Sequence, residues 1–222
     1  MALRPAEDIK KDVTDRLYWD DRVDAAQINI DVNNSTVTLR GTVPSVLSLE
    51  AALWDARNVA GVSEVVDDIR IYPGEVVTMP ADLEIANNAQ SVLEWSPHLD
   101  STDIEVSVEA GRLTLRGSVD AFWKKMRAEN LVNDLAGVVE VVNELTVVPG
   151  GDLRDQAIAE EIVAELERST LVNADDITVV VDHGAVTLTG TVRMWSARHA
   201  AYEAALFTGG VTDIHDNIKV AG

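Results

Sequence analysis

Apolar residues recur at every fourth position in three separate stretches of the chain, beginning at Ile9, Ile85 and Ile158. Residues four apart lie on one face of an α-helix, so the spacing predicts an amphipathic helix in each stretch. The positions on these three faces are Ile9, Val13, Leu17, Ile85, Ala89, Leu93, Ile158, Ile162 and Leu166.

After each predicted helix, apolar and polar residues alternate twice in succession. A period of two is typical of a strand with one buried face. The first alternation covers 28–32, 104–108 and 177–181, and the second covers 37–43, 113–119 and 186–192. Ala110-Gly111 and His183-Gly184 separate the two alternations in the later stretches and favour a tight hairpin, for which Asn34-Ser35 is the weaker counterpart.

The chain is therefore a threefold repeat, because VTLRGTV, LTLRGSV and VTLTGTV recur about 75 residues apart. Each is followed by a helix-compatible segment with small residues in register, then by Gly-Val and a third alternation. Each repeat thus reads αββαβ. The predicted fold class is α+β, with three tandem αββαβ units, each consisting of two helices packed on one face of a small three-stranded mixed sheet. We expect the units at 1–74, 79–149 and 152–222, joined by links containing Pro and Gly at 72–82 and 148–155.

Two sets of glycines recur at matched positions of the repeats, and we interpret both as structural. The first set favours a bend in the second strand or close approach of a helix. The second set lies where a helix is expected to end, as in a left-handed cap. The residues are Gly41, Gly117 and Gly190 in the first set, and Gly61, Gly137 and Gly210 in the second. No phosphate-binding GxGxxG sequence is present.

The three glycine-containing strand sequences, each preceded by a helix and a hairpin and followed by Gly-Val, resemble the BON domain family, named for bacterial osmotically inducible and nodulation proteins. The resemblance covers nearly the whole chain. It implies an αββαβ module without enzymatic activity that attaches to phospholipid surfaces. It also implies a role in envelope and stress proteins, some of them periplasmic and osmotically inducible.

Composition narrows the function classes. The formal net charge of −20 is spread over all three repeats, which disfavours nucleic acid as a partner. The chain has four His, no Cys and no HExxH sequence, so we expect no enzyme, no cofactor and no metal. Neither a secretory signal nor a transmembrane segment is evident, so a cytoplasmic location is expected, or a periplasmic one if a signal was removed.

One segment departs from the acidic background, because DAFWKKMR at 120–127 is both basic and aromatic. RMWSARH in the third repeat has a similar composition at the same place. Exposed aromatic and basic residues suit a phospholipid surface, whereas Trp, Met and Arg also favour protein interfaces. The candidate contact residues for lipid or partner are Phe122, Trp123, Lys124, Lys125, Arg127, Arg193, Trp195 and Arg198.

The sequence leaves two interpretations of this segment open. The candidate partners are a phospholipid surface, contacted by the second helices, or a protein, with the chain acting as a chaperone-like scaffold. In the second case the aromatic and basic residues pack between the repeats or against the partner. Trp19 and Trp95 occupy matched positions at the end of the first helices, where we expect them to pack into the core or as a hydrophobic staple.

Overall fold

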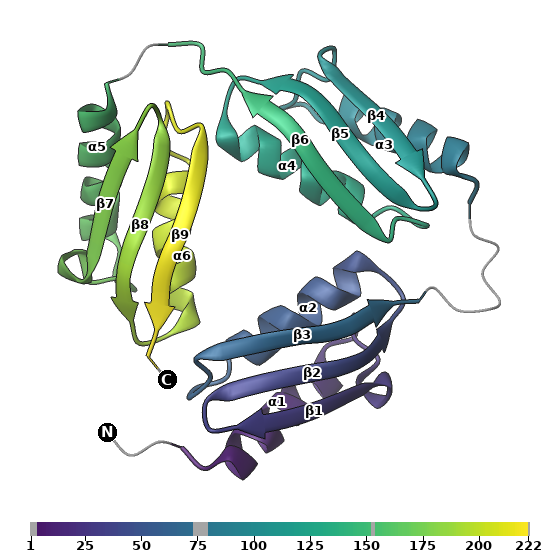
Figure 1. The fold of residues 1–222 in the computed structure, drawn as a ribbon, viewed down its shortest axis with the longest axis vertical. Helices are drawn as coiled ribbons and strands as arrows, with labels where there is room; N and C mark the ends of the chain where they lie inside the picture. Colours follow the sequence, from purple (N-terminus) through teal and green to yellow (C-terminus); the bar gives the residue numbers. More distant parts are fainter. Residues whose placement is uncertain (1–3, 73–79, 152–153, 222) are drawn as a thin grey trace.

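The computed structural model describes residues 4–72, 80–151 and 154–221, so parts of the links predicted at 72–82 and 148–155 lie outside the described residues. It contains three repeats of one architecture (Figure 1), which confirms the predicted α+β fold class. The first repeat comprises α1 (Ala6–Trp19), β1 (Ile28–Asn33), β2 (Thr36–Val43), α2 (Val46–Arg57) and β3 (Glu64–Ile71). The second comprises α3 (Asp82–Trp95), β4 (Ile104–Glu109), β5 (Arg112–Val119), α4 (Phe122–Asn133) and β6 (Glu140–Val147). The third comprises α5 (Asp155–Arg168), β7 (Ile177–Asp182), β8 (Ala185–Val192), α6 (Trp195–Leu206) and β9 (Asp213–Val220).

Each repeat folds into its own mixed sheet. In the first, β2 is the central strand, antiparallel to β1 and parallel to β3. The parallel pair requires a crossover, which α2 supplies, while a two-residue turn suffices for the antiparallel pair. The strand order and pairing are the same in the other two repeats.

The predicted apolar faces form the core of each repeat. Ile9, Val13 and Leu17 of α1 are fully buried, and the matched residues of α3 and α5 are buried too. The second helices contribute small side chains, among them Ala52 and Ala56, which are also fully buried. Small side chains let α2 approach the sheet closely, and α1 and α2 contact each other as well as the sheet, so both helices lie on the same face.

Gly117 lies inside β5 with φ +122°, in the left-handed half of backbone space that favours glycine. A Cβ atom there would overlap the carbonyl oxygen of Asp103, which leads into β4. Gly41 and Gly190 have the same relation to the residue that precedes the first strand of their repeats. The close approach therefore comes from that strand's entry, and not from a helix. The second set, represented by Gly137, lies in the turn beyond the second helix and not directly at its cap.

An aspartate at the start of the first helix holds the hairpin in two repeats. The Asp155 carboxylate accepts hydrogen bonds from the backbone N–H groups of His183 and Gly184, both at 2.9 Å. Asp82 accepts the equivalent bonds from the Ala110–Gly111 turn at 2.8 and 3.0 Å. Both turns have positive φ angles, and their N–H groups point at the carboxylate. The helix and the hairpin are thereby joined at the edge of the sheet.

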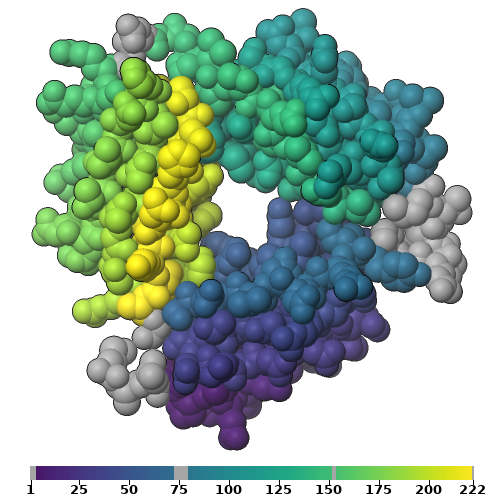
Figure 2. All heavy atoms as spheres, viewed as in Figure 1, coloured from purple at the N-terminus to yellow at the C-terminus, as the bar shows by residue number. Residues whose placement is uncertain are grey.

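The three repeats surround a central opening (Figure 2). The second helices α2, α4 and α6 lie on the inner sides of the repeats (Figure 1). Contacts between these helices close the arrangement, which we call the ring.

Candidate functional site

Three of the aromatic and basic residues predicted as contacts lie where the repeats of the ring meet, namely Phe122, Trp195 and Arg198. We use the word junction for each contact between the second helix of one repeat and the next repeat. The first residues of the three second helices occupy matched positions and are Val46, Phe122 and Trp195. Each of them contacts the following repeat, and the third repeat contacts the first. The ring therefore has three junctions of related geometry.

Two of these first residues join the buried core of the next repeat. Phe122 is only 5% exposed and belongs to the buried apolar cluster of the third repeat, together with Met126 at its edge. Val46 is buried in the cluster of the second repeat in the same way. In α2 and α4 the side chain that begins the helix thus adds to the core of the next repeat.

The junction between the third and first repeats is aromatic and cationic. The guanidinium of Arg57 lies 5.2 Å from the Trp195 ring centroid, and that of Arg198 lies 4.9 Å from it. His199 meets Trp54 edge to face, with ring centroids 4.9 Å apart. Burial, followed by the charge of Arg198, lowers the pKa of Arg57. The Trp195 indole therefore has cation–π contacts with one arginine of its own repeat and one of the first repeat.

The junction between the first and second repeats carries a partly buried hydrogen bond. The amide of Asn133 donates to the carboxyl of Glu50 at 3.1 Å. Burial raises the pKa of Glu50, and the nearby acidic groups of Glu129 and Asp134 raise it further. Asn133 is the last residue of α4, and Arg57 is the last residue of α2. At two junctions, therefore, the last residue of a second helix contacts the second helix of the preceding repeat in the ring.

The remaining predicted contact residues have different surroundings. Trp123 is half-buried, with the Lys124 ammonium 5.7 Å from its ring centroid. Lys124 is paired with Asp120 at 2.7 Å, and Arg198 with Asp216 at 2.7 Å. The structure places these two cations in ion pairs within their own repeats. They are therefore less available to a ligand than an unpaired cation would be.

Arg127 and Arg193 are exposed, whereas Lys125 is half-buried. Among the described residues, none of these three cations has a carboxylate within ion-pairing distance. The exposed thioether side chain of Met194 lies next to Arg193 in the chain. The predicted set thus divides into three residues within junctions, three cations without an ion-pair partner in the described part of the chain, and the neighbouring Trp123 and Lys124, which belong to neither group.

The expectation that Trp19 and Trp95 pack into the core is wrong, since they are 82% and 86% exposed. The buried face of α1 passes through Leu17, and a residue two positions further lies about 200° around the helix. Trp19 therefore points away from the core, and the same holds for Trp95 on α3. Tyr18, which contacts Trp19 edge to face, is exposed as well. The fold therefore leaves all three of these aromatic side chains in solvent.

Sequence reasoning missed Val46 and Arg57 as members of the junctions. Alignment of the repeats was the available signal, because these residues match Phe122 and Asn133. In the part of the chain that the structure describes, no three His, Asp or Glu side chains are grouped so that they could hold a metal ion. No helix in these segments has the length and apolar character needed to cross a bilayer.

Comparison with protein-family models gives one family, the BON domain, matched at residues 5–73, 81–149 and 154–222. A curated relative, osmotically-inducible protein Y of Escherichia coli (strain K12), is 27% identical over 128 residues. The match covers 56% of this chain and 64% of the relative. The chain therefore matches somewhat less than two thirds of that protein's length.

Two solved structures of CdsD, a structural protein of the type III secretion system of Chlamydia trachomatis, match at low similarity. One comprises its C-terminal domain, with 13% identity, a TM-score of 0.27 and coverage of 99% of this chain and 100% of that one. The other has 14% identity, a TM-score of 0.25 and coverage of 95% and 91%. Likenesses this low say nothing about function here.

Proposed function

This chain belongs to the BON domain family, and on that premise we propose that it is a non-enzymatic binding protein of envelope or stress physiology that attaches peripherally to phospholipid surfaces. The name of the relative refers to osmotic induction, which supports the stress role. The cytoplasmic location expected from the sequence gains no support from this relative, and a periplasmic one is compatible with the proposal.

The observation that carries the lipid proposal is the group of accessible cations on α4 and before α6. Lys125, Arg127 and Arg193 have no carboxylate partner among the described residues, although the chain is strongly acidic. Trp123 and Met194 accompany them with apolar surface. Cations beside an aromatic side chain can bind headgroup phosphates while the aromatic side chain itself enters the membrane–water interface.

The expected attachment is weak and sensitive to salt. Each basic residue near an anionic surface contributes about 1 kcal/mol, so three contribute about 3 kcal/mol. The acidic remainder opposes approach, but charges beyond about 8 Å are largely screened at physiological salt. Salt therefore screens both the attraction and the repulsion. Because the cations come closest to the surface, we expect attachment at low ionic strength to exceed that at high ionic strength.

Co-flotation with vesicles tests the proposal. The protein is mixed with anionic or neutral vesicles at low and physiological salt, and compared with a variant carrying Trp123→Ala, Lys125→Ser, Arg127→Ser and Arg193→Ser. Lys124 is left in place because it is paired with Asp120.

A matched control removes three other cations, with Arg40→Ser, Arg112→Ser and Arg116→Ser, which are ion-paired along the sheets. We expect the native chain and the control to float with anionic vesicles, and the first variant to stay in solution. Equal flotation of both variants would contradict the assignment of these cations. Absence of flotation by the native chain would contradict lipid attachment itself.

A second candidate function is a protein-binding scaffold, favoured by the exposed Tyr18, Trp19 and Trp95. Large aromatic side chains in solvent are typical of sites that bind a partner. In the absence of vesicles, light scattering would show whether the chain suppresses aggregation of a heat-unfolded client enzyme. Loss of this suppression in a Trp19→Ala, Trp95→Ala variant, with flotation unaffected, would assign the function to these exposed tryptophans.

A further inference from the structure

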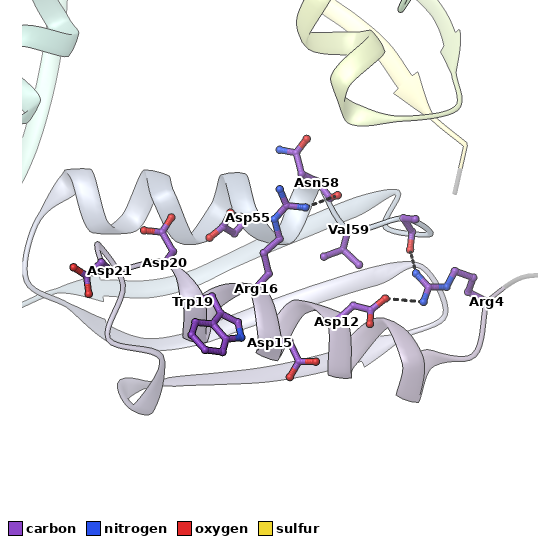
Figure 3. A pocket seen from close by; sticks show the side chains of 11 residues that line it. Arg4, Asp12, Asp15, Arg16, Trp19, Asp20, Asp21, Asp55, Asn58 and Val59 are labelled. Atoms are coloured by element: carbon purple, nitrogen blue, oxygen red, sulfur yellow. Dashed lines mark hydrogen bonds and ion pairs between the residues drawn. The ribbon is translucent and has the colours of Figure 1, made fainter.

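The first repeat carries a groove of about 710 Å³ between α1 and α2 (Figure 3). The groove is open to solvent, and the exposed indole of Trp19 is part of its lining. Two arginines, Arg4 and Arg16, line it together with five carboxylates, so the lining keeps an excess of negative charge. Arg4 pairs with Asp12 at 2.7 Å. The carboxylates that line the groove are Asp12, Asp15, Asp20, Asp21 and Asp55.

One of these carboxyl groups is buried and incompletely paired. Asp55 is 6% exposed, and its Oδ1 atom accepts a hydrogen bond from Arg16 Nε at 3.3 Å. Its Oδ2 atom is buried and has no hydrogen-bond donor among the described residues. Asp20 lies on the same side of the groove and is itself paired with Arg22 at 2.6 Å. A buried carboxylate oxygen without a donor is costly, so a function for it is expected.

The other two repeats show that the fold does not need this carboxylate. Asp55 is the tenth residue of α2, and the tenth residues of α4 and α6 are Leu131 and Ala204. Apolar side chains therefore fill the matched position in both sister repeats. The third repeat has a related groove between α5 and α6 that includes Ala204 and Phe207 but no buried carboxyl group. The buried acid is thus particular to the first repeat.

The titration of Asp55 agrees with a site that takes up a positive charge. Burial raises the pKa of this carboxyl group, the neighbouring Asp20 raises it further, and Arg16 opposes the rise. In contrast, Arg22 holds the pKa of Asp20 well below its usual range. The pair is therefore stabilised by a proton or by a donor cation at Asp55.

We propose that this groove binds a small organic cation with a primary ammonium group, which donates to Asp55 Oδ2 while its carbon chain lies against Trp19. When Asp55 is ionised, its orphaned Oδ2 atom is a hydrogen-bond acceptor, and an N–H donor satisfies it; when Asp55 is protonated, it can instead donate to Asp20. A quaternary ammonium could approach the indole face but could not satisfy the oxygen. The same primary ammonium group occurs in a free amine and in an ethanolamine lipid headgroup. This site does not depend on the second-helix cations.

Isothermal titration of the full chain with ethanolamine, and separately with tetramethylammonium at equal ionic strength, tests the chemistry. We expect heat from ethanolamine at concentrations up to about 10 mM, and a clearly weaker response to tetramethylammonium. Asp55→Leu copies the second repeat and should retain the fold, while Asp55→Asn keeps the shape of the side chain. Both should weaken ethanolamine binding by about tenfold or more.

Asp31→Asn is the matched control, since it removes one negative charge from the sheet face outside the groove, and we expect it to leave binding unchanged. Equal responses to the two cations, or unchanged binding in both Asp55 variants, would overturn the proposal.

Vesicles with and without phosphatidylethanolamine separate the two sources of the ammonium group. Flotation that requires this lipid and is lost in Asp55→Leu, with no response to free ethanolamine, would assign the site to the headgroup. The variant that lacks Trp123 and the three cations tests only the lipid-attachment proposal. If it no longer floats but still binds ethanolamine, the groove acts independently of those cations. No response to ethanolamine in either form would refute the inference.

Discussion

Phe122 provides the sharpest test of the ring, because it belongs to one repeat in sequence and to the next in packing. It begins α4 of the second repeat, is 5% exposed and lies in the apolar cluster of the third repeat. Phe122→Ala would remove most of this contact without changing any charge. The variant therefore tests whether the repeats are coupled through the junction.

The magnitude of the effect follows from the buried area. A phenylalanine side chain buries roughly 150–250 Å², and about 25 cal/mol per Å² gives roughly 4–6 kcal/mol as an upper range. Measured truncations of buried Phe to Ala cost about 3–5 kcal/mol, and we expect a value in this range. Since the residue links two repeats, part of the loss should appear as earlier unfolding of the third repeat.

Urea unfolding followed by circular dichroism, together with differential scanning calorimetry, measures both effects. The chain contains one other phenylalanine, Phe207, which is 64% exposed and serves as the matched control. We expect Phe207→Ala to change stability by no more than about 0.5 kcal/mol. Equal effects of the two substitutions, or a small effect of Phe122→Ala without any change in cooperativity, would refute the assigned junction.

Two further predictions concern titrating groups. Asp155 has its pKa lowered by the N–H groups of Gly184 and His183, so its contribution to stability is present above the unfolded-state value of 3.8 and is lost as pH falls. Asp155→Ala should lower Tm at pH 7, and calorimetry should find the difference shrinking in acid. Glu50 has its pKa raised by burial and by Glu129 and Asp134, so its contribution is full below 4.5 and is lost as pH rises. Glu50→Gln should raise Tm at pH 7, and a lower Tm in the variant at that pH would contradict the assigned direction of the pKa shift.

Most of the fold could be predicted because each repeat restates the same two periodicities. A spacing of four at Ile9 and Val13, and a spacing of two at Val37 and Leu39, both arise from burial against the repeat's own core. Three aligned copies reinforce each pattern. The αββαβ order therefore followed directly from the spacing of apolar residues.

The junctions were harder to predict because periodicity indicates that a side chain is buried but not which surface covers it. Phe122 stands among cations and resembles an exposed residue in sequence, yet the third repeat covers it. Trp19 shows the converse, since an apolar residue at the end of an amphipathic helix is exposed when it lies off the buried face. Asp55 could have been found, because its counterparts Leu131 and Ala204 are apolar.

The geometry of the junctions explains why three repeats form a closed ring. Each junction joins the start of one second helix to the following repeat, so the two surfaces in contact are different. Contacts of this kind form rings when the rotation closes and open arrays when it does not. Here the rotation closes after three steps, because Trp195 reaches Arg57 of the first repeat. A chain of only the first two repeats would leave Phe122, at the start of α4, in solvent, together with the surface of the first repeat around Arg57. The third repeat covers both.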